Sequence, residues 1–226
     1  MGARAWGEGF HLHDEPGDPQ ARLELQKKSV GASERDEAAR SAWREKVRGL
    51  DPNKLRFVDE CGTNISLTTL YARAPKGERA LGKAPRNWGK NPTLIASLSL
   101  EGLPQKNMVV EGATDTRAFE TYVEHFLCAN LKKRQVVIMD NLSAHKGERI
   151  RTLIESKGAH LLFLPSYSPD FNPIEGAFSK LKNSLRKAKA RTRESLLEAI
   201  GRALDEVSDH DAQGWFGHCG YGVPIS

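Results

Sequence analysis

Short apolar runs alternate with longer amphipathic stretches along most of this chain, and turn-forming residues separate them. Compact apolar runs predict strands, whereas apolar residues spaced three or four apart predict helices. Strands are predicted at 55–58, 65–71, 93–100, 108–110, 136–139 and 161–164. Helices are predicted at 33–49, 114–131, 146–156, 174–185 and 193–207. The final residues, 210–226, are interpreted as a turn and coil that places Trp215 and Phe216 against the body.

The order of these elements predicts an α/β fold. Strands grouped early in the chain, followed by strand–helix alternation, favour a mixed central sheet flanked by helices. Residues 1–30 are rich in Gly, Pro and acidic residues and lack periodicity, which predicts an irregular N-terminal tail. Residues 31–226 are expected to form one domain that includes a helical C-terminal part.

Length and composition narrow the classes of protein that the chain can belong to. It has 226 residues, of which 38% are hydrophobic and 28% charged, as in a soluble globular protein. No apolar run reaches the roughly 18 residues of a membrane span, and the N-terminus lacks the apolar core of a secretory signal. Three separated cysteines without a CxxC pair favour a reducing compartment. We therefore expect a cytoplasmic protein without a membrane partner.

The net charge of +5 is concentrated in two stretches. Seven basic and no acidic residues lie between Gly176 and Arg193, and six basic residues accompany Glu78 between Arg73 and Lys90. Clusters of this kind suit a polyanionic partner, although a solvated basic face without a ligand explains them equally well.

Three carboxylates stand at positions that suit phosphate chemistry. Asp59 follows the strand 55–58, Asp140 follows the strand 136–139, and Glu175 lies at the start of the helix 174–185. Carboxylates and water suit Mg²⁺ or Mn²⁺ better than His or Cys would. Two such ions, roughly 4 Å apart, activate the attacking oxygen and stabilise the leaving oxygen in phosphodiester cleavage. The pattern therefore predicts a metal site.

The segments that carry these acids resemble a known family. FVDECGTN, VVIMDNLSAHK and LPSYSPDFNPIEGAFSKLK are similar to the three motifs of DDE-type transposases of the mariner-like insertion-sequence group. The segment SPDFNPIE and the 34 residues between Asp140 and Glu175 are the most specific parts of the resemblance, which extends from about residue 27 to 221. It implies a ribonuclease H-like fold and a metal-binding triad of Asp59, Asp140 and Glu175, with two ions of Mg²⁺ or Mn²⁺.

The resemblance also implies a reaction and its partners. A metal-dependent endonuclease of this kind cuts DNA at transposon ends and joins the freed 3′-hydroxyl to target DNA, in a dimer associated with the nucleoid. Asn141 and His145 match motif positions that support Asp140 or a nearby phosphate; a turn-forming role for Asn141 and a helix-start role for His145 stay open. Double-stranded DNA would be held by basic residues at nine positions: Arg73, Lys76, Arg79, Lys83, Arg86, Lys180, Lys182, Arg186 and Lys187.

The chain departs from the family at its N-terminus and at three other positions. The first 30 residues are too short and irregular for the upstream helix-turn-helix region of the family, so a separate chain could supply DNA recognition. Cys61, Gly176 and Phe178 stand where the family often has Ser, Glu and Trp. Two alternatives follow: an inactive DNA-binding remnant or accessory subunit of a split transposase, and another ribonuclease H-like nuclease.

Overall fold

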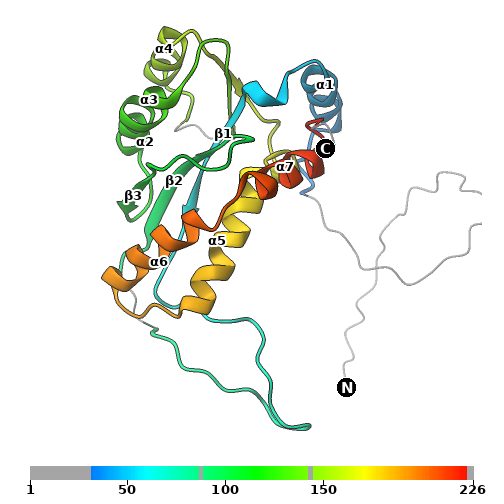
Figure 1. Ribbon diagram of the computed structural model, residues 1–226. Coiled ribbons are helices and arrows are strands. Elements are labelled where there is room, and N and C mark those ends of the chain that lie inside the picture. Colours follow the sequence, from blue (N-terminus) through cyan, green and yellow to red (C-terminus); the bar gives the residue numbers. More distant parts are fainter. Residues whose placement is uncertain (1–31, 87–88, 142–144, 223–226) are drawn as a thin grey trace, which may run out of the picture. The chain divides into compact units, whose positions relative to one another are not determined.

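The computed structural model describes residues 32–86, 89–141 and 145–222 (Figure 1). From Ser33 onward the described residues belong to one compact unit. The predicted irregular tail at residues 1–30 lies outside the described residues, as do residues 223–226 of the predicted domain.

A five-stranded mixed sheet with strand order β3-β2-β1-β4-β5 forms the centre of this unit. The strands are β1 (Leu55–Gly62), β2 (Pro92–Leu98), β3 (Met108–Glu111), β4 (Val136–Met139) and β5 (His160–Phe163). β1 pairs antiparallel with β2 and parallel with β4, so the sheet changes from antiparallel to parallel at its central strand. The predicted mixed sheet is therefore confirmed.

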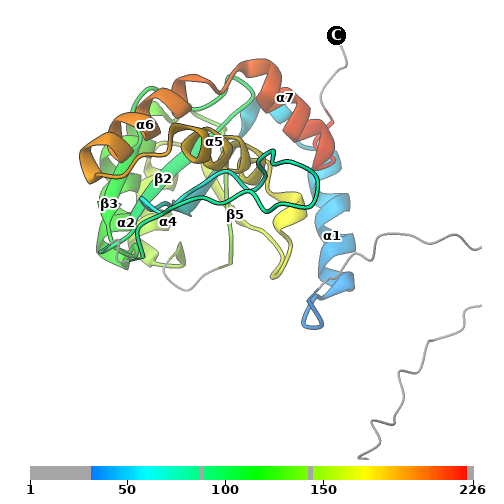
Figure 2. The ribbon, with the colours of Figure 1, turned by 90° about the horizontal axis from the view of Figure 1, so that it is seen from below.

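Helices cover both faces of the sheet (Figures 1 and 2). They are α1 (Glu37–Arg48), α2 (Thr116–Tyr122), α3 (Cys128–Asn130), α4 (Glu148–Ser156), α5 (Ile174–Ala188), α6 (Arg193–Asp205) and α7 (Asp209–His218). A single π-helical turn, Val123–Leu127, joins α2 to α3. Because side chains alternate along a strand, Phe57 and Cys61 of β1 pack on α1, α5, α6 and α7, while Val58 packs on α2, α4 and the π turn.

The predicted strand at 65–71 is wrong. β2 takes the edge of β1 that this segment would have needed, with Gly62 opposite Thr93. The Asn64 side chain instead accepts hydrogen bonds from the backbone N–H and hydroxyl of Ser66, which closes a local turn. The segment is part of the β1–β2 loop, residues 63–91, which extends far from the body (Figure 1).

The C-terminal coil predicted for residues 210–226 is also wrong in its described part, because residues Asp209–His218 form α7. The Ser208 side chain accepts a hydrogen bond from Asp211 N, and the Asp211 carboxylate accepts one from Ser208 N. This capping box satisfies N–H groups that a helix start leaves unpaired. Phe216 is fully buried, as expected, and Trp215 packs at the edge of the same core.

Gly176 stands in the first turn of α5 because the Trp215 ring lies against its backbone. A Cβ atom at Gly176 would lie 2.5 to 2.8 Å from three atoms of that ring. We expect Gly176→Ala to destabilise the protein by about 1 to 3 kcal/mol, since the ring and helix must move apart. The matched control is Gly201→Ala in α6, where a Cβ would meet nothing within 4 Å. That change is expected to stabilise by about 0.5 to 1 kcal/mol; urea unfolding of both variants gives the comparison.

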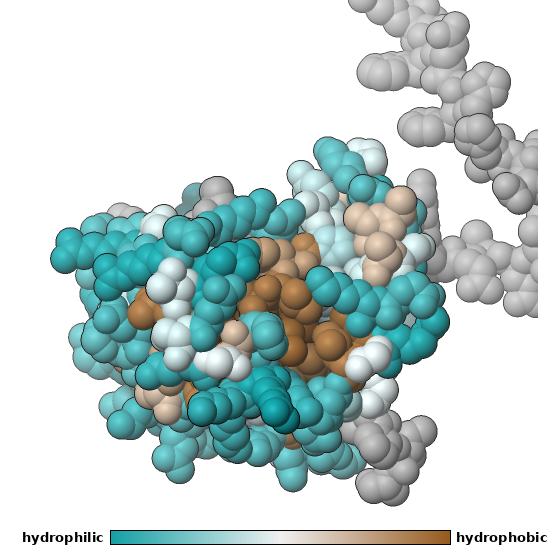
Figure 3. Space-filling model, turned by 90° about the horizontal axis from the view of Figure 1, so that it is seen from above, coloured by the Kyte–Doolittle hydropathy of each residue, from teal (hydrophilic) through white to brown (hydrophobic). Residues whose placement is uncertain are grey.

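Two further expectations from composition can be compared with the described residues. No helix among them is long and apolar enough to cross a membrane. Cys61, Cys128 and Cys219 are all free thiols. Figure 3 shows one face of the molecule, on which hydrophilic residues surround a central apolar area.

Candidate active site

Asp59 lies inside β1 and not at its end, because β1 continues to Gly62 along β2. β4, the other neighbour of β1, stops at Met139 opposite Val58. The next residues along the two strands are Asp59 and Asp140, so the parallel register brings both acids to the point where β4 ends. The prediction that Asp59 follows a strand is thus wrong in detail. The two carboxylates do lie close to the same end of the parallel pair β1 and β4.

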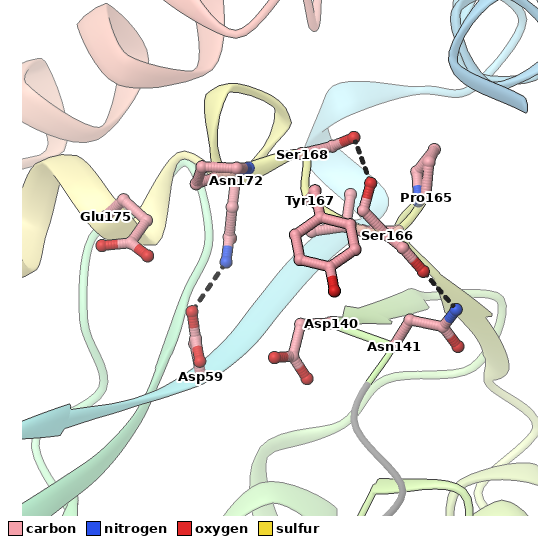
Figure 4. Close-up of a pocket in the computed structure, with 11 residues that line it drawn as sticks. Asp59, Asp140, Asn141, Pro165, Ser166, Tyr167, Ser168, Asn172 and Glu175 are labelled. Atoms are coloured by element: carbon pink, nitrogen blue, oxygen red, sulfur yellow. Dashed lines mark hydrogen bonds between the residues drawn. The ribbon is translucent and has the colours of Figure 1, made fainter. Parts of the chain in front are cut away.

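Glu175 enters the same pocket from the first turn of α5. The pocket has a volume of about 370 Å³, and Asp59, Asp140 and Glu175 all line it (Figure 4). Glu175 is exposed, Asp140 is partly exposed, and Asp59 is buried to 9% exposure. The three carboxylates come from a central strand, a strand end and a helix start.

The environment of Asp59 disfavours its charged form. Burial raises the pKa of Asp59 to about 7; the hydrogen bond from Glu60 N acts in the opposite direction, and the charges of Asp140 and Glu175 add to the increase. Negative charge is therefore concentrated at this pocket, and a bound cation would relieve the repulsion.

Asn172 contacts Asp59 directly, and the sequence analysis did not single it out. Its amide nitrogen donates to Asp59 Oδ2 at 2.8 Å, and its amide oxygen is buried without a hydrogen-bond partner. The signal was present, because Asn172 lies inside the quoted SPDFNPIE segment, three residues before Glu175. Asn172 therefore fixes the rotamer of Asp59.

His145 joins Asp140 to Glu60 behind the pocket. Its Nδ1 lies 2.5 Å from Asp140 Oδ1, its Nε2 lies 3.2 Å from Glu60, and its ring stacks on Phe119 at 4.0 Å. Burial is the largest single influence and opposes the charge on His145, but the hydrogen bonds and negative charges of Asp140 and Glu60 together outweigh it and raise the pKa of His145 to about 9. The position of His145 holds the Asp140 carboxylate in place. Asn141, the other predicted supporting residue, donates to Ser166 Oγ at 3.0 Å.

The loop between β5 and α5 is anchored by α1. The buried Arg40 pairs with Asp170 at 2.7 Å, donates to Ser168 Oγ at 2.7 Å, and lies 4.2 Å from the centre of the Phe171 ring. The Tyr221 hydroxyl donates to Phe171 O at 2.6 Å. These contacts fix the backbone immediately before Asn172, and thereby the start of α5.

The nine predicted DNA-contacting residues fall into two groups. Those at positions 73–86 are exposed on the β1–β2 loop, and those at positions 180–187 lie on α5. Within the α5 group, Lys180 is held by the protein itself: its Nζ lies 2.6 Å from Asp211 and 2.7 Å from Glu206 O. Arg186 donates to Asn183 Oδ1 at 2.9 Å.

The donor set at the pocket fits a hard divalent cation. Three carboxylates offer oxygen ligands, which Mg²⁺ and Mn²⁺ prefer. Among the described residues, however, no three His, Cys, Asp or Glu side chains are close enough together to hold one ion as they stand. Glu175, on the first turn of α5, is the exposed member of the three carboxylates.

Comparison with solved structures confirms the predicted ribonuclease H-like fold. The Mos1 mariner paired end complex with Mg matches 88% of this chain and 64% of its own, with a TM-score of 0.71 and 13% identity. The catalytic domain of Mos1 mariner transposase is matched over 86% of this chain and 100% of its own, with a TM-score of 0.51 and 12% identity. At these identities the likeness establishes the fold alone.

Sequence comparison establishes the family. The Transposable element Tc1 transposase of Caenorhabditis elegans is 26% identical over 120 residues, which are 53% of this chain and 42% of that relative. The match therefore spans less than half of the relative's length. The family model of the DDE superfamily endonucleases matches residues 54–197, well over half of the chain and including all three carboxylates. This chain is a member of the DDE superfamily of endonucleases.

Proposed function

We propose that residues 31–226 form the catalytic domain of a transposase, which cleaves DNA at transposon ends and transfers the freed strand to target DNA. The observation that carries this proposal is the meeting of Asp59, Asp140 and Glu175 in one pocket. The similar Tc1 and Mos1 proteins are transposases, which supports the same reaction.

Asp59, Asp140 and Glu175 would hold two ions of Mg²⁺ or Mn²⁺. The Mos1 structures with Mg and with Mn support this choice of metal. When bound, such ions supply a nucleophile near neutral pH and neutralise charge on the phosphate. His145 orients Asp140, and Asn172 keeps the Asp59 carboxylate turned toward the pocket. Positioning of this kind by residues behind the ligands typically changes metal affinity or activity by about 10- to 100-fold.

The β1–β2 loop is proposed to contact double-stranded DNA and a second copy of the chain. Its basic residues are exposed, and so are three apolar residues: Leu70, Tyr71 and Leu81 have 70%, 91% and 94% exposure. Large apolar side chains on an extended segment suggest a surface that a partner covers. A dimer in the reaction complex would provide that partner, as the paired end complexes of Mos1 support. Recognition of the transposon ends is left to a separate segment or chain.

Neutralising the basic residues of the loop is expected to weaken DNA binding in a salt-dependent way. Changing Arg73, Lys76, Arg79, Lys83 and Arg86 to Gln removes counterion release at each phosphate that these side chains neutralise. The slope of log K against log salt should then fall by about 1 for each such phosphate. Fluorescence anisotropy with a duplex across a salt series measures this slope. Lys46→Gln on α1, far from the loop (Figure 1), should leave the slope unchanged; equal slopes for the wild type and both variants would contradict binding of DNA by the loop.

The test of the proposed function is nicking of supercoiled plasmid DNA. We expect cleavage with Mg²⁺ or Mn²⁺, none with a chelator, and joining of a pre-cut transposon end to plasmid. Nicking of RNA–DNA hybrids in preference to duplex DNA would favour another ribonuclease H-like nuclease. DNA binding without any nicking in either metal would favour the inactive remnant.

A further inference from the structure

A second pocket, of about 500 Å³, lies at the end of the sheet where β1 begins and β2 ends. Its walls come from the turn after β2, residues 99–106, and from the π turn and α3. It shares no lining residue with the carboxylate pocket. Neither the resemblance to transposases nor the proposed reaction gives this pocket a role.

Arg56 lies at the inner wall of this pocket and is buried to 5% exposure. One of its terminal nitrogens donates to Ser97 Oγ at 3.2 Å, while its Nε is buried without a hydrogen-bond partner. Within the described ranges, no carboxylate forms an ion pair with Arg56 within 4 Å. A buried guanidinium normally has a carboxylate or another anion as its partner, because an unpaired charge loses its hydration on burial. The buried guanidinium of Arg56 therefore lacks an anionic partner among the described residues.

The other residues that line the pocket also favour a negatively charged ligand. Lys106, Lys132 and His125 line the pocket and are exposed. Glu101 is the acidic residue among the described lining residues, and its carboxylate lies 3.7 Å from Lys132 Nζ. Arg56, Lys106 and Lys132 outnumber Glu101 in the lining, so the pocket carries a net positive charge that an anionic ligand would balance.

The lining and the volume of the pocket indicate a ligand larger than an inorganic oxyanion. The π turn places His125 and Phe126 in its wall, and such turns are rare and frequently mark functional sites. Leu103 and Phe126 add apolar surface beside the cations. A volume of about 500 Å³ is in the range of small-molecule sites, so the ligand would carry organic atoms as well as charge.

We propose that this pocket binds a phosphate group carried on an organic body, with Arg56 as the inner anchor and Lys106 at the mouth. Two sources share this chemistry: a free nucleotide and a backbone phosphate of DNA. Arginine is suited to either, since its planar fork pairs with two phosphate oxygens at once. The site is independent of the proposed cleavage reaction.

The test uses the side-chain Nε–H resonance of Arg56 in the full chain, assigned by its absence in Arg56→Met. Met is an unbranched side chain like Arg, and burying an unpaired charge is itself costly, so the variant is expected to fold. Titration with inorganic phosphate and with dAMP should shift this resonance saturably. Both ligands should also raise the unfolding midpoint of the wild type more than that of Arg56→Met.

A short DNA duplex added to Asp140→Asn protein, so that cleavage plays no part, separates the two sources. A shift of the Arg56 resonance with the duplex identifies backbone phosphate as the ligand. A shift with phosphate and dAMP alone identifies a free nucleotide. An unchanged resonance with all three, or equal stabilisation of the wild type and Arg56→Met, overturns the proposal whatever the outcome of the nicking assay.

Discussion

Asp140→Asn is expected to abolish the nicking of plasmid DNA, with a fall in rate of more than about 10³-fold. The amide keeps the shape of the side chain but removes the charge that the pocket shares with His145. Loss of residues that merely orient metal ligands already costs about 10- to 100-fold, so loss of a ligand exceeds that range. The same variant should lose binding of Mn²⁺ in a calorimetric titration carried out with duplex DNA present.

Two further variants show whether that loss is specific to the site. His145→Gln leaves all three carboxylates in place but removes the contact of His145 with Asp140, so we expect an intermediate fall of about 10- to 100-fold in Mn²⁺ affinity. Glu155→Gln, on the exposed side of α4, should behave as the wild type. Unchanged Mn²⁺ affinity in Asp140→Asn, with normal folding, would remove this carboxylate from the metal site.

Arg40→Ala is expected to destabilise the protein although Arg40 does not line the pocket. The change removes the contacts of Arg40 with Asp170 and Ser168, and it removes the nearer of two cations that lie over the Phe171 ring. Asp170 keeps its pairing with Arg35 at 2.9 Å. Because the Asp170 side chain is 48% exposed, water can compensate part of the loss, and we expect about 2 to 3 kcal/mol. For a chain of this length the melting temperature should fall by about 5 to 10 °C.

The control for this variant lies on the same helix. Arg48 pairs with Glu45 at 2.7 Å, but both side chains are more than two-thirds exposed. Arg48→Ala should therefore change stability by less than about 0.5 kcal/mol. Similar melting temperatures for the two variants would mean that α1 does not anchor the loop. Arg40→Ala should also weaken Mn²⁺ binding at temperatures where it remains folded, since the loop carries Asn172 and Glu175.

The positions of the three carboxylates could be predicted because local patterns determine them. Buried apolar runs stop at or near Asp59 and Asp140, and an apolar stripe beginning at Ile174 fixes the helix that carries Glu175. Residues 65–71 show the limit of such patterns. They have the β-branched composition of a strand, yet pairing depends on which segment occupies the edge of β1, and β2 occupies it.

Side-chain partners far apart in sequence could not be predicted from local patterns. His145 meets Glu60 across 85 residues, and Asn172 meets Asp59 across 113. α7 was missed for another reason: Gly214 and Gly217 lower its helix propensity, while its stability comes from the capping box at Ser208 and the burial of Phe216. The stability of such a helix depends on tertiary packing, which the periodicity of the sequence does not reveal.

The central position of β1 has a consequence for synthesis on the ribosome. β1, β2 and β3 are consecutive in the chain and can pair antiparallel as soon as they emerge, but Asp140 and Glu175 arrive much later. More than 100 residues separate Asp59 from Glu175, which at typical translation rates is a delay of about 5 to 20 s. A nascent chain therefore carries Asp59 alone until Asp140 is added, and the proposed active site is complete only when α5 packs onto the finished sheet.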